Sequence, residues 1–522
     1  MSTDQPGASA AQRSRLLAVM LLPTLCATSV LLAGCRPVGP KYSRPAYTAP
    51  AAYKETGATA VQAPPPTAPN GGAWQPATPS DGLLRGKWWE IYHDAELNQL
   101  EDRIAVSNQT LKQATEAYLA SHDQVASARA SLLPTLSAGP SLNRDSVSTN
   151  GTSYSSTRGK SYNDLYLTGT ATWEPDFWGR MRLAVQSARA SAQASAADLA
   201  VVDLTLHAEL ASDYFSLRGL DSQSRLYAAT VKNLEEQLSL TQHRLNGGVG
   251  TEADVAQART QLETVRAQWV DLKTGRAQYE HAIAVLVNAN PAQFSLPELP
   301  LDGELPKVPV GLPSQLLERR PDIAAAERLT AAANAQIGIA TSAYYPNITL
   351  SATGGFESMH AGTWIQGPGS LWTLGAQAAE LLFDGGQRHA LKDEAKHAYE
   401  AQAASYKSTV LSAFQDVEDQ LSTLRVLEEE NVVESRAVAS AQHSLDLANQ
   451  RYQGGVTNYL EVLTAETTLL QNQRTATTLD SRRFVASVGL IRALGGGWDS
   501  SQLPAENRKA ATPKNAAQPT TK

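Results

Sequence analysis

Few residues in this chain of 522 could carry out covalent or metal chemistry. The sequence contains two cysteines, Cys26 and Cys35, and nine histidines that are scattered along its length. It has no Gly-x-Ser-x-Gly nucleophile motif, no His-Glu-x-x-His zinc motif and no pair of carboxylates in a catalytic context. We therefore predict that the protein is not an enzyme and holds no metal ion, which leaves the thiols as the chemistry to explain.

Cys35 stands at the end of a segment with the features of a secretory signal. Two arginines precede an uncharged stretch over 16–33, and this stretch ends in Leu-Ala-Gly-Cys. That ending resembles a bacterial lipobox, in which the cysteine thiol receives a diacylglyceryl group and cleavage leaves an acylated amino terminus. We predict a signal peptide over 1–34 and a lipid anchor (diacylglycerol and an N-acyl or palmitoyl chain) on Cys35. An ordinary signal peptide with a chance cysteine is the alternative.

Composition limits the partners and the mode of membrane contact. The formal net charge is −7, so nothing favours a nucleic-acid partner. No apolar run of about 18 residues follows the signal, so the sequence predicts no transmembrane helix in the mature chain. Strands of a membrane barrel alternate apolar and polar residues and escape this search, so they have to be sought segment by segment.

An internal duplication organises the chain. Gly247-Gly248-Val249 returns as Gly454-Gly455-Val456, and two further pairs of segments, 131–138 with 343–352 and 174–182 with 380–388, occur in the same order. We predict a Pro/Ala-rich arm over 35–85, a first repeat over 86–300, a second repeat over 301–498 and a disordered tail over 499–522. Each repeat is expected to run helix, strand, strand, long helix, Gly-Gly turn, long helix.

The long helices are predicted from proline-free, alanine-rich sequence. They should extend from Arg180 to about Asn246 and from about Gln387 to Gln453. The segment after the first Gly-Gly turn places apolar residues at alternating spacings of three and four, which is the seam of a coiled coil. Its members are Val255, Ala258, Leu262, Val265, Trp269, Leu272, Tyr279, Ile283 and Leu286, with Arg276 as a break. The glycines permit the tight reversal between the helices.

Four segments alternate apolar and polar residues, as two-faced strands do. They are 135–142, 162–173, 347–353 and 370–378. Alternation alone fits a membrane barrel and a sheet packed on helices equally well. Four strands cannot close a membrane barrel, and an open sheet edge in lipid is not viable. If these strands lie in a membrane, several chains must share one barrel, and a trimer would supply 12 strands.

Several segments together resemble a known family. They are CRPVGPKYSRP at 35–45, GKWWEIYHDAELNQL at 86–100, LLERRPDIAAAERLTAAANAQIGIATSAYYPNITLSA at 316–352, LLFDGGQR at 381–388 and both Gly-Gly-Val turns. The chain resembles the outer-membrane efflux proteins of the TolC/OprM type, especially their NodT-like lipoprotein branch.

The resemblance implies a mainly α chain with a membrane β-barrel. It implies a homotrimer whose 12-stranded outer-membrane barrel, four strands per chain, is continuous with a long α-helical periplasmic barrel. Such a protein is a passive exit duct for drugs and other toxic small molecules. A periplasmic membrane-fusion adaptor couples it to an inner-membrane pump of the resistance-nodulation-division class. No cofactor is implied beyond the lipid on Cys35.

The resemblance also assigns roles to residues near the turns. The Gly-Gly-Val turns would form the periplasmic tip and contact the adaptor. Asp254 and Glu461 match acidic residues that ring the closed entrance, and Tyr452 matches a tyrosine of the closing network. A basic residue expected after the second turn is Thr457 here, and a further acidic position is Thr464, so any ion-pair lock would be built differently. The alternative is that Asp254 and Glu461 only suit helix N-termini.

Two tryptophans could contact the membrane. Trp173 and Trp372 lie on the predicted strands and are candidates for the aromatic belt at the membrane surface.

The same duct could serve type I protein secretion instead of drug efflux. A structural envelope lipoprotein that does not conduct is the alternative from a different class.

Overall fold

The computed structural model describes residues 37–50, 52–56, 86–150, 159–311 and 313–504. Cys35, the signal segment and most of the predicted tail lie outside the described residues. In the part of the chain that is described, no helix is both long enough and apolar enough to cross a bilayer.

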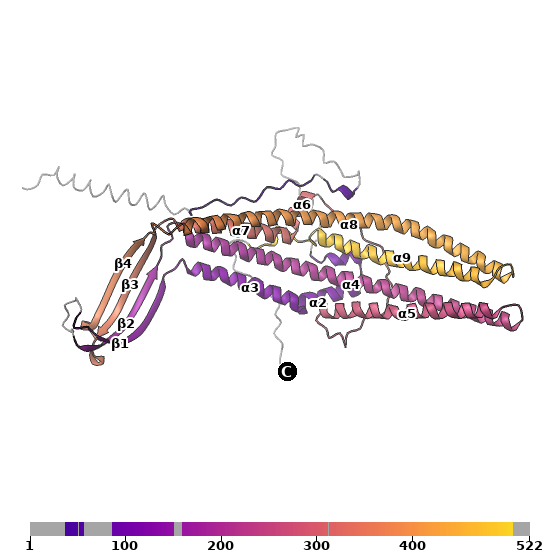
Figure 1. The fold of residues 1–522 in the computed structure, drawn as a ribbon, viewed down its shortest axis with the longest axis horizontal. Helices are drawn as coiled ribbons and strands as arrows, with labels where there is room; N and C mark the ends of the chain where they lie inside the picture. Colours follow the sequence, from indigo (N-terminus) through magenta and orange to yellow (C-terminus); the bar gives the residue numbers. More distant parts are fainter. Residues whose placement is uncertain (1–36, 51, 57–85, 151–158, 312, 505–522) are drawn as a thin grey trace, which may run out of the picture. The chain divides into compact units, whose positions relative to one another are not determined.

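The elements occur in the same order twice (Figure 1). The first set consists of α2 (Ala95–Ser107), α3 (Gln109–Ala130), β1 (Thr135–Ser146), β2 (Ser161–Trp173), α4 (Arg180–Asn246) and α5 (Glu252–Leu286). The second set consists of α6 (Pro313–Arg319), α7 (Pro321–Ser342), β3 (Asn347–Ser358), β4 (Ser370–Ala379), α8 (Gln387–Gln453) and α9 (Tyr459–Ala493). Short 3-10 turns precede the first set, connect β3 with β4 and follow α9.

Matching lengths support the duplication. The long helices α4 and α8 have 67 residues each, and the return helices α5 and α9 have 35 each. Helices α3 and α7 both have 22 residues. The predicted order of elements within each repeat, and the predicted ends of both long helices, are therefore confirmed.

Contacts group the described residues into two compact units, and each unit takes segments from both repeats. One unit contains the sheet and comprises 37–45, 120–192 and 327–404. The other contains both Gly-Gly turns and comprises 46–119, 193–326 and 405–504. The predicted repeat boundaries follow the sequence, whereas these units follow packing, because equivalent segments of the two repeats pack on each other.

The four strands form one antiparallel sheet in the order β1-β2-β3-β4 (Figure 1). The register aligns the predicted faces. Leu136, Ala171, Ala352 and Leu374 are successive partners across the sheet and form an apolar row. The next row, on the opposite face, is polar: Ser137, Thr170, Thr353 and Thr373. The alternation read from each strand therefore adds up to one apolar and one polar face.

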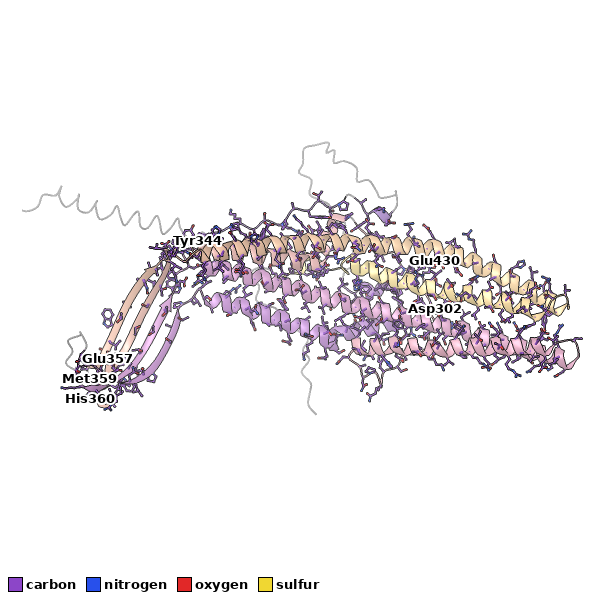
Figure 2. The ribbon with its side chains drawn as sticks, viewed as in Figure 1. Asp302, Tyr344, Glu357, Met359, His360 and Glu430 are labelled. Atoms are coloured by element: carbon purple, nitrogen blue, oxygen red, sulfur yellow. The ribbon has the colours of Figure 1, made fainter. Side chains whose placement is uncertain are left out.

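Two strands are longer than the sequence indicated. β1 continues to Ser146 and β3 to Ser358, beyond the predicted ends at 142 and 353. The added residues of β1 are Asn143, Arg144, Asp145 and Ser146, which have no apolar periodicity but still pair with β2. The backbone ladder continues after the side-chain signal has ended, which is why the alternation underestimated these strands. Figure 2 shows Glu357, Met359 and His360 at that end of the sheet, with Tyr344 at the other.

The described part of the arm is extended, as predicted, and it is packed on helices. In the sheet-containing unit, the Tyr42 hydroxyl donates to Glu327 Oε1 of α7 at 2.6 Å, and Asn334 Nδ2 donates to the Pro40 carbonyl at 3.1 Å. Gly39 has a φ of +129°, and a Cβ there would lie 2.6 Å from the Gly338 backbone of α7. The arm can approach α7 this closely only because both positions are glycine.

Most of the predicted seam of the return helix is buried. Ala258, Leu262, Val265 and Ile283 of α5 are each at most 3% exposed. Arg276, the break in the seam, has a partner of its own: its Nε lies 2.8 Å from Asp221 Oδ1 of α4, and its Nη2 donates to the Leu296 carbonyl at 2.8 Å. The charge is therefore neutralised where the seam changes from apolar packing to a polar contact.

Candidate functional site at the helical turns

Each long helix ends in a Schellman motif, in which a left-handed residue reverses the chain. Gly248 has a φ of +74°; its N–H donates to the Leu245 carbonyl and the Val249 N–H to the Arg244 carbonyl, each at 3.0 Å. The second hairpin repeats this at Gly455, with a φ of +70°. The second glycine of each pair carries the conformational requirement. Val249 and Val456 project from the turns and are 71% and 73% exposed.

Asp254 belongs to a capping box at the start of α5. The Asp254 N–H donates to Thr251 Oγ1 at 3.2 Å, and the Thr251 N–H donates to Asp254 Oδ2 at 3.1 Å. The carboxylate also lies at the positive end of the helix dipole. This arrangement favours the alternative that Asp254 serves the helix start, and the gate role stays a prediction.

Glu461 joins the two helices of the second hairpin. It lies in the first turn of α9, where its Oε1 is 2.5 Å from Arg451 Nη1 of α8 and its carboxylate also accepts from the Thr457 hydroxyl. The family resemblance implies a basic partner after the turn, where this chain has Thr457. The basic residue lies before the turn instead, in the last turn of α8, where the helix dipole favours a cation.

Tyr452 lies between the two hairpins, at the end of α8. Its side chain is 6% exposed, the Arg244 guanidinium of α4 lies 4.6 Å from its ring centroid, and Tyr459 of α9 packs edge-on at 5.6 Å. Burial raises the pKa of Tyr452; the Arg244 guanidinium opposes this rise, and the charge of Asp254 adds to it. Its hydroxyl is buried without a hydrogen-bond partner among the described residues. Asp254 therefore acts on Tyr452 through its charge, whereas Glu461 pairs with Arg451.

Further along α9, Glu466 is a buried carboxyl that the sequence analysis did not single out. Glu466 Oε1 accepts from Gln237 Nε2 of α4 at 3.3 Å, and the Tyr459 hydroxyl donates to Gln237 Oε1 at 3.0 Å. Its side chain is 5% exposed and Oε2 has no partner among the described residues. Burial raises the pKa of Glu466 from the ordinary 4.5 to about 7. The sequence did contain a signal for its burial, because Glu466 continues the three- and four-residue spacing of Tyr459, Val462 and Leu469.

The two candidate belt tryptophans lie on the apolar face of the sheet. Trp372 of β4 is 76% exposed and faces Gly354 across the strand pair. Trp173 ends β2, is 38% exposed and donates its indole N–H to the Leu132 carbonyl at 3.0 Å. Their position suits a membrane surface, and the belt role stays a prediction.

A family profile described as "Outer membrane efflux protein" matches residues 100–289 and 312–496. The pyoverdine export outer membrane protein OpmQ of Pseudomonas aeruginosa is 33% identical over 428 residues, which cover 81% of this chain and 90% of OpmQ. The probable efflux pump outer membrane protein TtgC of Pseudomonas putida is 31% identical over 498 residues, which cover 94% and 99% of the two chains.

Solved structures show the same fold. The outer-membrane channel OprN superposes with a TM-score of 0.79 at 27% identity, covering 88% of this chain and 99% of OprN. The open state of the MtrE outer membrane channel of Neisseria gonorrhoeae gives a TM-score of 0.75 at 27% identity, covering 89% and 99%.

Paired helical hairpins and a four-stranded sheet with one apolar face define the class of outer-membrane channels. Within that class, the chain belongs to the outer membrane efflux protein family. The predicted family and fold class are confirmed. Members of this family are channels rather than enzymes, and this protein is an outer-membrane efflux component.

Proposed function

We propose that this protein is the exit duct of a tripartite efflux system. Three copies would share one barrel in the outer membrane and conduct drugs or other toxic small molecules outward. An inner-membrane pump of the resistance-nodulation-division class would supply the energy, and a periplasmic adaptor would couple the two. The observation that carries the proposal is the pair of unpaired sheet edges.

Both outer strands of the sheet lack a second neighbour among the described residues. β1 pairs only with β2, and β4 pairs only with β3. The free edges would leave backbone N–H and C=O groups without partners in hydrocarbon, where each such group costs several kcal/mol. Pairing β1 of one copy with β4 of the next satisfies both edges at once and closes the sheet without any other partner.

The number of copies follows from the need for a lumen. Two copies would give a barrel of about eight strands, whose interior is just filled by side chains. Three copies give 12 strands and leave an open passage. The polar face formed by Ser137, Thr170, Thr353 and Thr373 would line that passage, and the apolar face would contact lipid.

The remaining partners and sites are part of the same proposal. A lipid anchor on Cys35 would attach the arm to the outer membrane, and the two Gly-Gly-Val turns would meet the adaptor. Asp254, Glu461 and Tyr452 would control the entrance. The names of OpmQ and TtgC support small molecules as cargo, since they describe pyoverdine export and an efflux pump.

Cross-linking tests the shared barrel directly, because the sequence has no cysteine after Cys35. A variant with Ser137→Cys in β1 and Thr373→Cys in β4 should give dimers and trimers on a denaturing gel after treatment with a flexible bismaleimide. The matched control carries Thr170→Cys and Thr353→Cys, which are partners within one sheet, and should stay monomeric. A ladder that stops at another number, or no intermolecular product, would refute the trimer.

Conductance separates the duct from a structural lipoprotein. The cross-linked protein would be placed in planar bilayers, both unchanged and with Asp254→Asn and Glu461→Gln combined. A closed duct conducts poorly, so larger steps are expected from the charge-neutralised form. A trimer that never conducts, even in that form, would favour the non-conducting envelope lipoprotein.

A further inference from the structure

A cavity of about 620 Å³ lies between α4, α8 and α9, in the unit that contains the turns. Two glycines let the helices approach around it. A Cβ at Gly219 of α4 would lie 2.6 Å from the Ser481 side chain of α9, and one at Gly489 of α9 would lie 2.7 Å from the Gln420 amide of α8. This volume is typical of a site for a small organic molecule.

The charge of the cavity wall has one sign. Arg482 and Arg492 are its only charged lining residues, and no acidic side chain faces them from the wall. Arg482 is partly neutralised from outside, because its Nη1 lies 3.8 Å from Glu430 of α8, which Figure 2 labels. Arg492 is an exposed residue at the rim of the cavity, and its guanidinium makes no hydrogen bond or ion pair with any described residue. The cavity therefore presents one uncompensated cation.

Gln420 supplies a second free donor beside Arg492. Both residues also line an adjoining cavity of about 230 Å³, where Arg320 is already paired with Asp322 and Asp416. The Gln420 amide touches Gly489, which precedes Arg492 by one helical turn, so the two side chains reach the same space. The amide has no hydrogen-bond partner among the described residues. A solvated arginine at a helix end would explain Arg492 alone, but not this convergence.

The rest of the wall can hold an apolar body. Val485 and Tyr279 are partly exposed and contribute apolar surface, whereas Leu427 and Val488 are only 2% and 0% exposed. The hydroxyls of Ser212, Ser216 and Ser481 donate to backbone carbonyls, so they line the cavity without a polar group left unsatisfied. A pocket with an apolar wall and a few converging donors is the usual design of a ligand site.

We propose that this cavity binds a small aromatic carboxylate. Its carboxylate pairs with the Arg492 guanidinium and accepts from the Gln420 amide, and its ring packs on Val485 and Tyr279. The cavity would prefer anionic over neutral ligands, which goes beyond the proposed role of the protein as a passive duct. Binding does not depend on conduction, so a failed conductance experiment leaves this proposal intact, and the converse also holds.

Titration calorimetry with 1-naphthoate tests the proposal on the full-length protein in detergent. The heat of titration into detergent alone is subtracted. Saturable binding is expected, and it should weaken as sodium chloride increases because the contact is ionic. The neutral analogue 1-naphthylmethanol should bind at least about tenfold more weakly, since it lacks the charge-assisted contact. Absence of saturable binding, or equal affinity for both compounds, would overturn the proposal.

Matched variants locate the site. Arg492→Gln should weaken naphthoate binding about tenfold or more and leave binding of the neutral analogue unchanged. Arg474→Gln is the control, because it removes the same charge from the same helix outside the cavity and should change nothing. If Arg492→Gln does not fold, Gln420→Ala replaces it, with weaker naphthoate binding expected. Equal effects of the cavity and control variants would place the binding elsewhere.

Discussion

Replacing Glu466 with glutamine should tighten the packing between α4 and α9 at neutral and alkaline pH. Glu466→Gln keeps an oxygen that accepts from Gln237 and removes the ionisable group. The wild-type carboxyl is buried, and burial disfavours its charged form. The substitution therefore removes a charge that the wild-type protein must hold in an apolar seam when the pH rises.

The magnitude follows from the pKa of Glu466, which burial raises from 4.5 to about 7. Between these values the folded protein holds a proton that the unfolded chain has lost, so the contribution of Glu466 to stability is greatest below about pH 4.5 and falls as the pH rises through about 7. A displacement of one pKa unit corresponds to about 1.4 kcal/mol, so this group destabilises the folded state by about 3 kcal/mol at pH 8. The glutamine variant lacks this loss.

Hydrogen exchange measured by mass spectrometry provides the assay. Peptides covering Gln237 and the first turns of α9 should exchange more slowly in Glu466→Gln than in the wild type at pH 8, after correction for the intrinsic exchange rate. The two proteins should differ little at pH 4.5. Glu461→Gln is the control for loss of a nearby exposed charge and should not reproduce the pattern. Equal protection of the Glu466→Gln and wild-type peptides at pH 8 would refute the reasoning.

Three other substitutions test local features. Gly248→Ala should destabilise the first hairpin by about 1 kcal/mol, because it places a side chain at a positive φ. Gly247→Ala is the control and should be nearly neutral. The rate of proteolysis at the turn measures the difference between the two variants. Thr251→Ala removes the N-cap of α5 and should cost about 1 kcal/mol, measured by exchange of the first helical turn. Tyr42→Phe removes the hydroxyl that donates to Oε1 of the buried Glu327 and should weaken binding of the arm to α7 by about 2 kcal/mol. Proteolysis within 37–50 should then be faster. An unchanged cleavage rate would count against the contact.

The long elements could be predicted because the sequence states their limits locally. Helix α4 lies in a proline-free stretch, and the pair of glycines after Asn246 ends it. The strands followed from alternation, and the register then placed their apolar residues in common rows. These signals extend over a few residues and do not depend on which helices or strands pack together.

The contacts of the candidate site depend on how the chain folds back on itself, both across one turn and between the two hairpins. Arg451 and Glu461 meet only because the turn brings the last turn of α8 to the first turn of α9. Glu466 meets Gln237 from the other hairpin. The family resemblance indicated Glu461 and its role. It did not indicate the partner of Glu461, because Arg451 lies before the turn and not after it.

Two sets of contacts near the turns hold different helices together: the ion pair of Arg451 and Glu461 lies within the second hairpin, and the contacts of Glu466 link the two hairpins. Glu461 and Arg451 are 38% and 54% exposed, and an exposed ion pair of this kind contributes about 0–1 kcal/mol and weakens in salt. Glu466, Gln237 and Tyr459 form a buried hydrogen-bonded set between α4 and α9. Separating those helices exposes the whole set. We therefore infer that the resistance to separating the two hairpins lies mainly in the buried seam between α4 and α9, further from the turn than the acidic residues that the family resemblance had indicated. Glu466 adds to this resistance while its carboxyl is protonated, below about pH 7, and opposes it above that pH.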